Sequence, residues 1–348
     1  MKNKKNKLLT VDKYIEEALY NKKFGYYMNK NPFGKKGDFI TAPGISILFS
    51  EMIAVWIISF WENLKCPKEF NLIELGAGNG EMMKILIKTF NQFPNFKKAC
   101  KINIFEKSNF LKKKQKDNIN NKDIKWLEDI KDLNNLPCIF IANEFFDALP
   151  IKQFIKKKGN WYERYIKIDH QKNSEFKDIL YDMKKFEDSI KLKISHGQKF
   201  IEFAPLTMSY LKSITNKVVV NDGGILIIDY GYFDKKIKNT LQAVHNHSYS
   251  NVLNNFGKSD ITHNICFHLT EKIIKKFGSF NVKTTNQKNF LLKLGILQRA
   301  EIITKNMPFT KKADVFFRIK RLIDKNSMGN LFKVMLITNK KNKFGLGF

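Results

Sequence analysis

The segment Asn71–Gly80 constrains the fold more than any other part of the chain, because an apolar strand runs there directly into a glycine-rich turn. The pattern predicts a strand over Phe70–Leu75 and a helix over Gly80–Phe90. Glycines at 76, 78 and 80 let backbone amides approach a ligand closely, and the following helix directs its N-terminus at the same point. A ligand site is therefore expected here, with a plain structural turn as the alternative.

The acid before this turn distinguishes between two nucleotide-like ligands. A dinucleotide fingerprint reads G-x-G-x-x-G, whereas here the third glycine comes one residue early and Glu74 precedes the turn. A carboxylate would repel a pyrophosphate but suits the cationic amino or sulfonium group of S-adenosylmethionine. These features favour a methyltransferase over a nicotinamide-dependent dehydrogenase.

Two further segments place chemical groups at strand ends. Glu106 ends a predicted strand, Lys101–Glu106, where an acid can accept both hydroxyls of a ribose. Asn143-Glu-Phe-Phe-Asp147 leaves a buried strand, Cys138–Asn143, and the reaction centre of an open α/β sheet lies outside such ends. The alternatives are a solvated acid at the first position and a helix N-terminus that favours acids at the second.

Short apolar strands alternate with helices, which predicts a parallel sheet covered on both faces and a Rossmann-like α/β fold. We expect one catalytic domain over 1–348, with an N-terminal helical and loop extension, a donor-binding core, an insertion containing a β-hairpin, and a C-terminal part. Their boundaries are 1–66, 67–150, 151–220 and 221–348. Further expected elements are helices over 9–20, 45–64, 108–115 and 287–304, a helix after 270, a hairpin over 151–169, and strands over 224–230 and 331–338, the last as an antiparallel edge.

Composition limits the partners. The formal net charge is +29, but nearly all of it comes from lysine, with only four arginines, and the lysines are spread along the chain. Nucleic-acid readers usually favour arginine, so a nucleic-acid partner is not the preferred interpretation. No membrane span or secretory signal is expected, and the four scattered cysteines are expected to be reduced.

The histidines and several aromatic residues are not assigned to a binding site. The pair His245 and His247 is a weak metal signal, and methyl transfer to nitrogen needs no metal, so no metal site is expected. The aromatic residues Trp56, Trp61, Phe24, Tyr26 and Tyr27 are interpreted as core in preference to a substrate cage.

Several segments together resemble the MidA family, the methyltransferases typified by a mitochondrial complex I assembly factor that methylates arginine on a complex I subunit. GDFITAP and ANEFFDALP are the distinctive ones. The matching segments are 18–27, 33–46, 71–80, 104–108, 141–154, 161–165, 227–232, 240–244, 260–262, 291–299 and 328–334. The resemblance implies a class I methyltransferase fold, S-adenosylmethionine as donor and a protein arginine as acceptor.

The site residues are assigned with this resemblance. An arginine stays protonated at ordinary pH, so carboxylates must hold its guanidinium. Glu144 is the first choice for that role, with Asp38 and Asp147 as second choices. Donor binding is assigned to Glu74, Gly76, Ala77, Gly78, Gly80, Glu106 and Asn143, and substrate binding to Gly37, Thr41, Pro43, Ser46, Phe145, Asp229 and Tyr230. The segment 33–46 is expected to close over the donor.

The chain also departs from the family pattern, and other functions stay open. Gly44 and Cys266 stand where the family often has acids, and Ala77 and Asn79 replace Pro and Arg in the glycine turn. The alternatives are methylation of RNA or a small molecule, and a non-catalytic assembly factor. The expected location is a bacterial cytoplasm, or the mitochondrial matrix in a eukaryote, and a homodimer is an open expectation.

Overall fold

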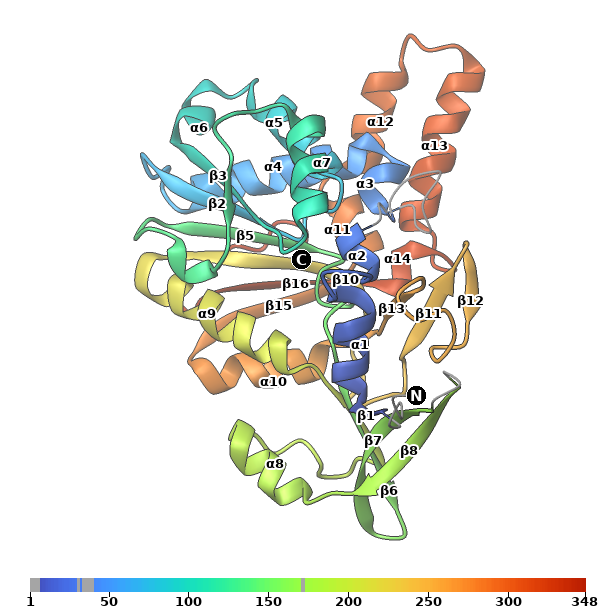
Figure 1. Cartoon of the computed structure of the whole chain (residues 1–348). Helices are drawn as coiled ribbons and strands as arrows, with labels where there is room; N and C mark the ends of the chain where they lie inside the picture. Colours follow the sequence, from blue (N-terminus) through green and yellow to red (C-terminus); the bar gives the residue numbers. More distant parts are fainter. Residues whose placement is uncertain (1–6, 30–31, 33–40, 170–172) are drawn as a thin grey trace.

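A computed structural model describes residues 7–29, 32, 41–169 and 173–348 (Figure 1). Its centre is a sheet in the order β15-β16-β10-β5-β2-β3-β4, with β14 paired to the end of β10. The strands are β2 (Phe70–Leu75), β3 (Cys100–Phe105), β4 (Lys125–Leu127), β5 (Cys138–Asn143), β10 (Gly223–Tyr232), β14 (Ile265–Cys266), β15 (Phe280–Asn286) and β16 (Phe332–Asn339). The predicted Rossmann-like α/β sheet is confirmed.

Helices cover both faces of this sheet because its strands are apolar on both sides. Adjacent residues of a strand point to opposite faces of the sheet. Leu226 and Ile227 of β10, for example, are both buried but belong to different core clusters. One face packs against α4 (Ile47–Asn63), α5 (Glu81–Phe90), α6 (Pro94–Ala99), α11 (Gln287–Lys293), α12 (Ile296–Thr304), α13 (Phe309–Ile323) and α14 (Met328–Leu331). The other face packs against α9 (Pro205–Asn221) and α10 (Phe267–Phe277). Trp56 and Trp61 lie in the first core, as predicted.

The last strand differs from its predicted place. β16 is antiparallel, as expected, but it lies between β10 and β15 instead of at the edge of the sheet. Ile337, for example, pairs with Ile225 of β10 on one side and Val282 of β15 on the other. The apolar composition of this strand fits that position, because an interior strand is covered on both faces.

The insertion is larger than the predicted hairpin. β6 (Lys152–Lys157) and β7 (Asn160–Ile168) form that hairpin, and they belong to a five-stranded antiparallel sheet. Its other strands are β1 (Lys7–Thr10), β8 (Ser174–Leu180) and β9 (Phe200–Phe203). β1 comes from the N-terminal extension, with Lys7 paired to Ile168, so this extension contributes one strand to the sheet of the insertion.

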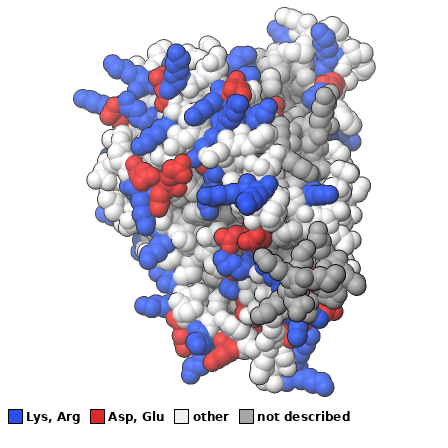
Figure 2. Space-filling view, in the orientation of Figure 1, with Lys and Arg blue, Asp and Glu red and all other residues white. Residues whose placement is uncertain are grey.

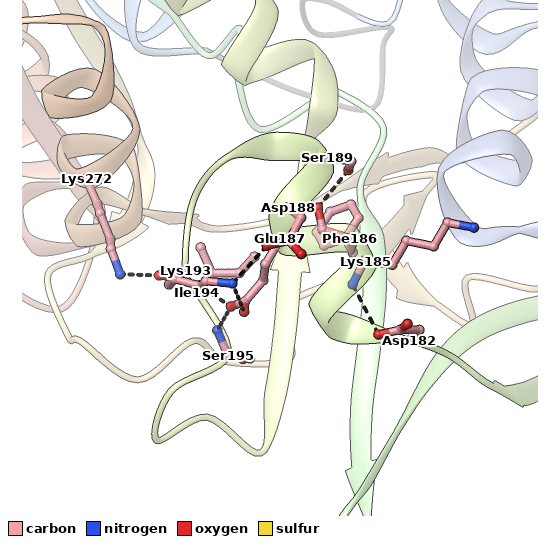
Figure 3. A network of polar contacts seen from close by, with 10 residues as sticks. All are labelled: Asp182, Lys185, Phe186, Glu187, Asp188, Ser189, Lys193, Ile194, Ser195 and Lys272. Atoms are coloured by element: carbon pink, nitrogen blue, oxygen red, sulfur yellow. Dashed lines mark hydrogen bonds and ion pairs between the residues drawn. The ribbon is translucent and has the colours of Figure 1, made fainter.

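A polar network ties the insertion together around α8 (Met183–Ile190) (Figure 3). Asp182 caps this helix, and Oε1 of Glu187 accepts hydrogen bonds from the backbone N–H groups of Ile194 and Ser195 at 2.5 and 2.7 Å. Although partial burial opposes it, these bonds lower the pKa of Glu187. Lys272 of α10 donates to the carbonyl of Lys193, which links this loop to the main body.

A third layer lies at the carboxyl ends of the central strands. It contains α1 (Val11–Tyr20), α2 (Tyr26–Asn29) and a small sheet of β11 (Gln242–His245), β12 (Ser248–Ser250) and β13 (Asp260–Thr262) (Figure 1). These elements share a core cluster that includes Tyr14, Tyr26 and Ile261. The structure also contains α3 (Ala42–Ile45), α7 (Asn109–Ile119) and η1 (Ile130–Asp132). The third layer covers the edge of the sheet at which ligands are expected.

The C-terminal helices also differ from the prediction. The helix predicted over 287–304 is two helices, α11 and α12, which are separated at Gly295, a residue with a φ of +83°. A left-handed residue ends one helix and starts the next at a new angle. Among the described helices, none has both the length and the apolarity needed to cross a membrane. The division of the chain at 66, 150 and 220 stays a prediction.

Candidate functional site

A cavity of about 210 Å³ opens at the carboxyl ends of β2, β3 and β5, under the third layer. A single water needs roughly 10–15 Å³ by this measure, so the cavity is large enough for an organic ligand. Its walls come from α1, α2, α9, β11 and β13 as well as from the central strands. The lining residues used below are Tyr20, Tyr27, Thr41, Gly76, Gly78, Phe105, Glu106, Ser108, Glu144, Phe145, Asp147, Tyr210, Tyr230 and Asp260.

The glycine turn has the backbone conformation that the sequence predicts. Gly76, Gly78 and Gly80 have φ values of +66°, +55° and +81°. A Cβ atom on Gly76 would lie 2.7 Å from Cδ2 of Phe145, so a side chain there would collide with the cavity wall. Gly76 and Gly78 line the cavity, whereas Gly80 packs against Ile119 and starts α5.

A smaller side pocket of about 40 Å³ adjoins the turn and contains unsatisfied acceptors. Its lining includes Glu74, Ala77 and Asn143. Oε2 of Glu74 and Oδ1 of Asn143 are buried and have no hydrogen-bond partner within the described part of the chain. Burial, together with the charge of Glu106, raises the pKa of Glu74 to about 8. Two buried acceptors without donors fit a ligand group that brings N–H bonds and positive charge.

Glu106 stands directly beyond β3 and is held in place by its neighbours. Its carboxylate accepts from the backbone N–H of Ser108 at 2.9 Å and from Nε2 of Gln115 at 3.1 Å. The same amide of Gln115 donates to the carbonyl of Gly78 at 2.9 Å. Burial raises the pKa of Glu106. Gln115, which the sequence gave no reason to select, therefore joins the glycine turn to the acid of the next strand.

Glu144 lies between the cavity and the side pocket in a strained conformation. Its φ is +52°, in the left-handed region that residues other than glycine rarely occupy. Oε1 accepts from the side-chain amide of Asn143 at 3.2 Å and from the backbone N–H of Ala42 at 3.4 Å. Burial raises the pKa of Glu144 to about 7, although the two hydrogen bonds oppose this rise. The strain directs this carboxylate into the cavity mouth.

Asp229 differs from its predicted role, because it lies beneath the cavity and not on its wall. It is fully buried, and its Oδ2 accepts from the backbone N–H groups of Phe145, Phe146 and Asp147 at 3.3, 2.9 and 3.4 Å. Burial and the charge of Glu144 raise the pKa of Asp229 to about 8. Its carboxyl group therefore holds the loop that carries Glu144, and it does not line the cavity.

The part of the cavity lining that comes from the third layer and the loop after β5 is acidic and aromatic. Asp147 and Asp260 line it, and the Tyr27 hydroxyl donates to Oδ1 of Asp260 at 2.7 Å. Burial, followed by the charges of Asp229, Glu144 and Asp260, raises the pKa of Asp147 well above its usual value. The ring of Tyr20 stacks on that of Tyr27 with centroids 5.8 Å apart, and its hydroxyl donates to the carbonyl of Ala148.

Two of these residues were missed by interpretation of single positions. Tyr27 lines the cavity, although it was predicted to be core, while Tyr26 beside it is core as predicted. Asp260 was not assigned a role. The signal that could have found both lies in the matching segments 18–27 and 260–262, which carry these residues.

The remaining predicted residues lie in different places. Thr41, Pro43 and Tyr230 line the cavity or the side pocket. Ser46 lines neither, because its hydroxyl caps α4 and accepts from the N–H of Leu48. Phe145 lines the cavity within an aromatic cluster with Phe105 and Tyr210. The predicted Gly37 and Asp38, and most of the segment 33–46, lie outside the described residues.

The described histidines belong to no group that could hold a metal ion. Within the described ranges, no group of three or more His, Cys, Asp or Glu side chains could hold a metal ion. His263 is buried, and burial lowers its pKa to about 4, so its imidazole is neutral. Its backbone N–H donates to the carbonyl of Asp147 at 3.0 Å, so it supports the loop after β5.

The sequence matches the model of a protein family described as "Putative S-adenosyl-L-methionine-dependent methyltransferase" over residues 52–284, more than half of the chain. The chain belongs to this family. The predicted methyltransferase class and its donor, S-adenosylmethionine, are thereby confirmed. The match includes the glycine turn, Glu106 and Glu144, and it ends before β16.

Curated relatives of this methyltransferase carry a more specific name. It is 28% identical to the mitochondrial protein arginine methyltransferase NDUFAF7 of Xenopus laevis, over 93% of this chain and 80% of the relative. The human protein of the same name is 26% identical, over 85% of this chain and 72% of its own length. The predicted resemblance to the MidA family is confirmed by these relatives.

Solved structures show the same fold. A Burkholderia thailandensis protein bound to S-adenosyl-homocysteine superposes with a TM-score of 0.83 at 21% identity, covering 98% of this chain and 90% of that one. A native structure from the same organism gives a TM-score of 0.78 at 21% identity, over 98% and 89%. The additional elements of this methyltransferase, including the third layer and the insertion, are therefore part of a recurring architecture.

Proposed function

We propose that this methyltransferase transfers a methyl group from S-adenosylmethionine to a guanidinium nitrogen of an arginine in a protein. The observation that carries this proposal is the group of acids and tyrosines around Glu144, which lines the same cavity as the glycine turn. Binding of the methyl donor alone would need only the part of the cavity that carries the glycine turn. Carboxylates and aromatic faces in the same cavity are the groups that bind a planar cation.

The chemistry of individual residues on the donor side supports this proposal. Glu74 and Asn143 offer buried acceptors to an ammonium group, and the carboxylate of Glu106 can accept hydrogen bonds from the two hydroxyls of a ribose. Phe105, Phe145 and Tyr210 give aromatic surface for a planar base, with ring centroids 5.5 to 6.3 Å apart. When bound, S-adenosylmethionine supplies an electrophilic methyl group on a sulfonium.

On the acceptor side, Glu144 has two tasks. As a carboxylate it accepts hydrogen bonds from the guanidinium and orients one nitrogen toward the methyl group. When that nitrogen forms its bond to carbon, the product must lose one proton, and the Glu144 carboxylate can accept it. A pKa of about 7 in the free protein suits a group that alternates between these states. Asp147 and Asp260 add negative charge beside the same cation.

The identity of the acceptor protein is proposed on similarity. The curated relatives are named mitochondrial arginine methyltransferases, and the family resemblance adds a subunit of respiratory complex I as acceptor. We extend that acceptor, and a role in assembling the complex, to this chain. The corresponding compartment is the mitochondrial matrix in a eukaryote or the cytoplasm in a bacterium, and a homodimer is part of the same proposal.

Glu144→Gln tests the proposed chemistry. The purified protein is incubated with methyl-labelled S-adenosylmethionine and a protein extract from cells that lack it, and methylarginine is identified by mass spectrometry. The variant should lose turnover by about 1000-fold, because a buried, hydrogen-bonded charge on the reacting group costs roughly 3–5 kcal/mol to remove. Donor affinity, measured by calorimetry, should stay within about threefold, because the carboxamide keeps the same shape.

The exposed Glu301→Gln on α12 is the matched control and should leave both quantities unchanged. Full turnover in Glu144→Gln would remove this residue from the mechanism. Donor binding without any methylarginine in the wild type would favour methylation of RNA or a small molecule. Absence of donor binding by the folded, ligand-free protein would favour a non-catalytic assembly factor.

A further inference from the structure

The helical hairpin of α12 and α13 projects from the body of the molecule at the end opposite the insertion (Figure 1). Its base is fixed to the body by buried apolar side chains and by polar contacts, two of which involve arginines. Arg299 pairs with Glu51 of α4 at 2.8 Å, and Nη1 of Arg318 donates to the carbonyl of Ile45 at 3.3 Å. The connection between the helices, residues 305–308, and the first turn of α13 are exposed. We call residues 305–312 the hairpin tip.

Large apolar side chains gather on this hairpin with nothing covering them in the described structure. Phe309 is 84% exposed, Ile302 67%, Phe317 64% and Met307 38%. Single exposed apolar residues are ordinary on a protein surface, but four on one projecting hairpin are not. Met307 and Phe309 lie at the tip itself, on either side of Pro308. The most solvated part of the hairpin therefore carries apolar groups.

The same hairpin is strongly basic. Residues 296–323 contain seven Lys or Arg and two acids, a net formal charge of +5, and three of the four arginines of the chain. One of the two acids, Asp314, pairs with Arg318 of the same hairpin at 2.8 Å. The tip lysines Lys305, Lys311 and Lys312 are exposed and make no ion pair within the described residues. Basic side chains stand beside uncharged surface at this end of the molecule in Figure 2.

The arrangement of these groups identifies the surface that they fit. Apolar side chains stand at the extremity, and unpaired lysines surround them within four residues. A membrane interface has the matching layers, with anionic headgroups outside and acyl chains beneath. A second copy of this chain docked through the same hairpin would bring one net charge of +5 against another, and the two would repel. We infer that the hairpin tip docks this protein on an anionic lipid surface, with Met307 and Phe309 inserted and the three lysines among the headgroups.

The test measures flotation of the full-length protein with vesicles. Vesicles of phosphatidylcholine with about 30% phosphatidylglycerol are compared with vesicles of phosphatidylcholine alone. Wild type should bind the anionic vesicles and not the neutral ones. Met307→Ser with Phe309→Ser should weaken this binding by roughly tenfold or more, because less apolar area is buried. Lys305→Gln, Lys311→Gln and Lys312→Gln together should weaken it by roughly fivefold per lysine.

The high net charge of the chain makes matched controls essential, because any protein of charge +29 is attracted to anionic vesicles. Lys158→Gln, Lys177→Gln and Lys184→Gln together remove the same charge from exposed positions in the insertion, at the far end of the molecule. Phe176→Ser with Leu180→Ser removes exposed apolar groups from β8. Both controls should bind within about twofold of wild type, and all variants should keep donor binding.

Three outcomes would overturn the inference. The first is absence of binding to anionic vesicles by the wild type, which would favour an acidic protein as partner of the tip. The second is equal weakening by the tip lysine variant and its insertion control, which would reduce the effect to net charge. The third is a dimer, detected by analytical ultracentrifugation, that becomes a monomer in the Met307/Phe309 variant, which would assign the tip to a second copy.

Discussion

The two sides of the cavity are built differently. The donor side comes from consecutive strand-turn-helix units, in which Glu74, the glycine turn and Glu106 follow one another within about thirty residues. The acceptor side combines α1 and α2 from the N-terminus, the loop after β5, and β13 from beyond residue 259. One side is specified by local sequence and the other by tertiary packing, so mutations on the two sides should have separable effects.

The largest effect is expected at the glycine turn. Gly76→Val should weaken donor binding by roughly 100-fold or more, because left-handed strain of about 1–3 kcal/mol adds to the collision with Phe145. Calorimetry with S-adenosylmethionine measures the change. Gly159→Val is the control, since its φ is also positive at +87° but the space around it is open. An unchanged affinity in Gly76→Val would show that the donor does not use this turn.

Asp260→Asn should affect only the acceptor side. The carboxamide can still accept the hydrogen bond from Tyr27, so the fold of β13 is preserved while one charge is lost. Because a hydrogen bond to a charged group contributes about 1.5–3 kcal/mol, kcat/KM for an arginine-containing substrate should fall roughly 10- to 100-fold. Donor affinity should not change. A parallel loss of donor affinity would mean that the two sides are not separable.

The affinity of the protein for S-adenosylmethionine should change by about tenfold for each pH unit. With a pKa of about 8, Glu74 holds a proton at pH 7 in the free protein, and a bound ammonium favours the carboxylate and expels that proton. Affinity should therefore rise between pH 6 and pH 8 and then level off. Calorimetry in two buffers of different ionisation enthalpy counts the released proton.

Two variants identify the group that releases the proton. Glu74→Gln should abolish the slope of affinity against pH, because it removes the titrating carboxyl group. Glu144→Gln should keep the slope, although Glu144 also has a raised pKa, of about 7. If the slope is lost in Glu144→Gln instead, the proton belongs to the acceptor side.

The smallest effect is expected for Tyr27→Phe. It removes the hydroxyl that holds Asp260 but keeps the ring that stacks on Tyr20. A decrease of roughly three- to tenfold in kcat/KM is expected, because a hydrogen bond of this kind contributes about 0.5–1.5 kcal/mol net. The effects of Tyr27→Phe and Asp260→Asn should not add, since the two residues act as one unit. Full additivity in the double variant would contradict their coupling.

The same contrast explains what the sequence could predict. β2, the glycine turn and Glu106 were identified because strand, turn and helix signals lie side by side there. The loop 143–147 was found from its position after a buried strand, although the burial of Asp229 beneath it was not. A carboxylate that accepts four backbone N–H groups, one of them from Tyr230, is not distinguishable in sequence from one that faces a cavity.

The two errors in sheet topology share a physical cause, which is pairing between distant segments. The five-stranded sheet was predicted as a hairpin because β1 and β7 are more than 140 residues apart. β16 was placed at an edge because nothing local shows that β15 pairs beyond it. Tyr27 was interpreted as core because an aromatic residue next to buried Tyr26 has the same pattern whether or not a cavity lies on its other side.

The interior position of β16 also has a consequence for biosynthesis. A nascent chain leaving the ribosome can pair β2, β3 and β5 early, but β10 keeps one open edge until residue 339 has emerged. Open strand edges are templates for misassembly, so an incomplete chain exposes one for the whole time in which about a hundred further residues are made. Chaperones that shield strand edges, and proteases that remove stalled products, should therefore recognise this protein mainly before its synthesis is complete.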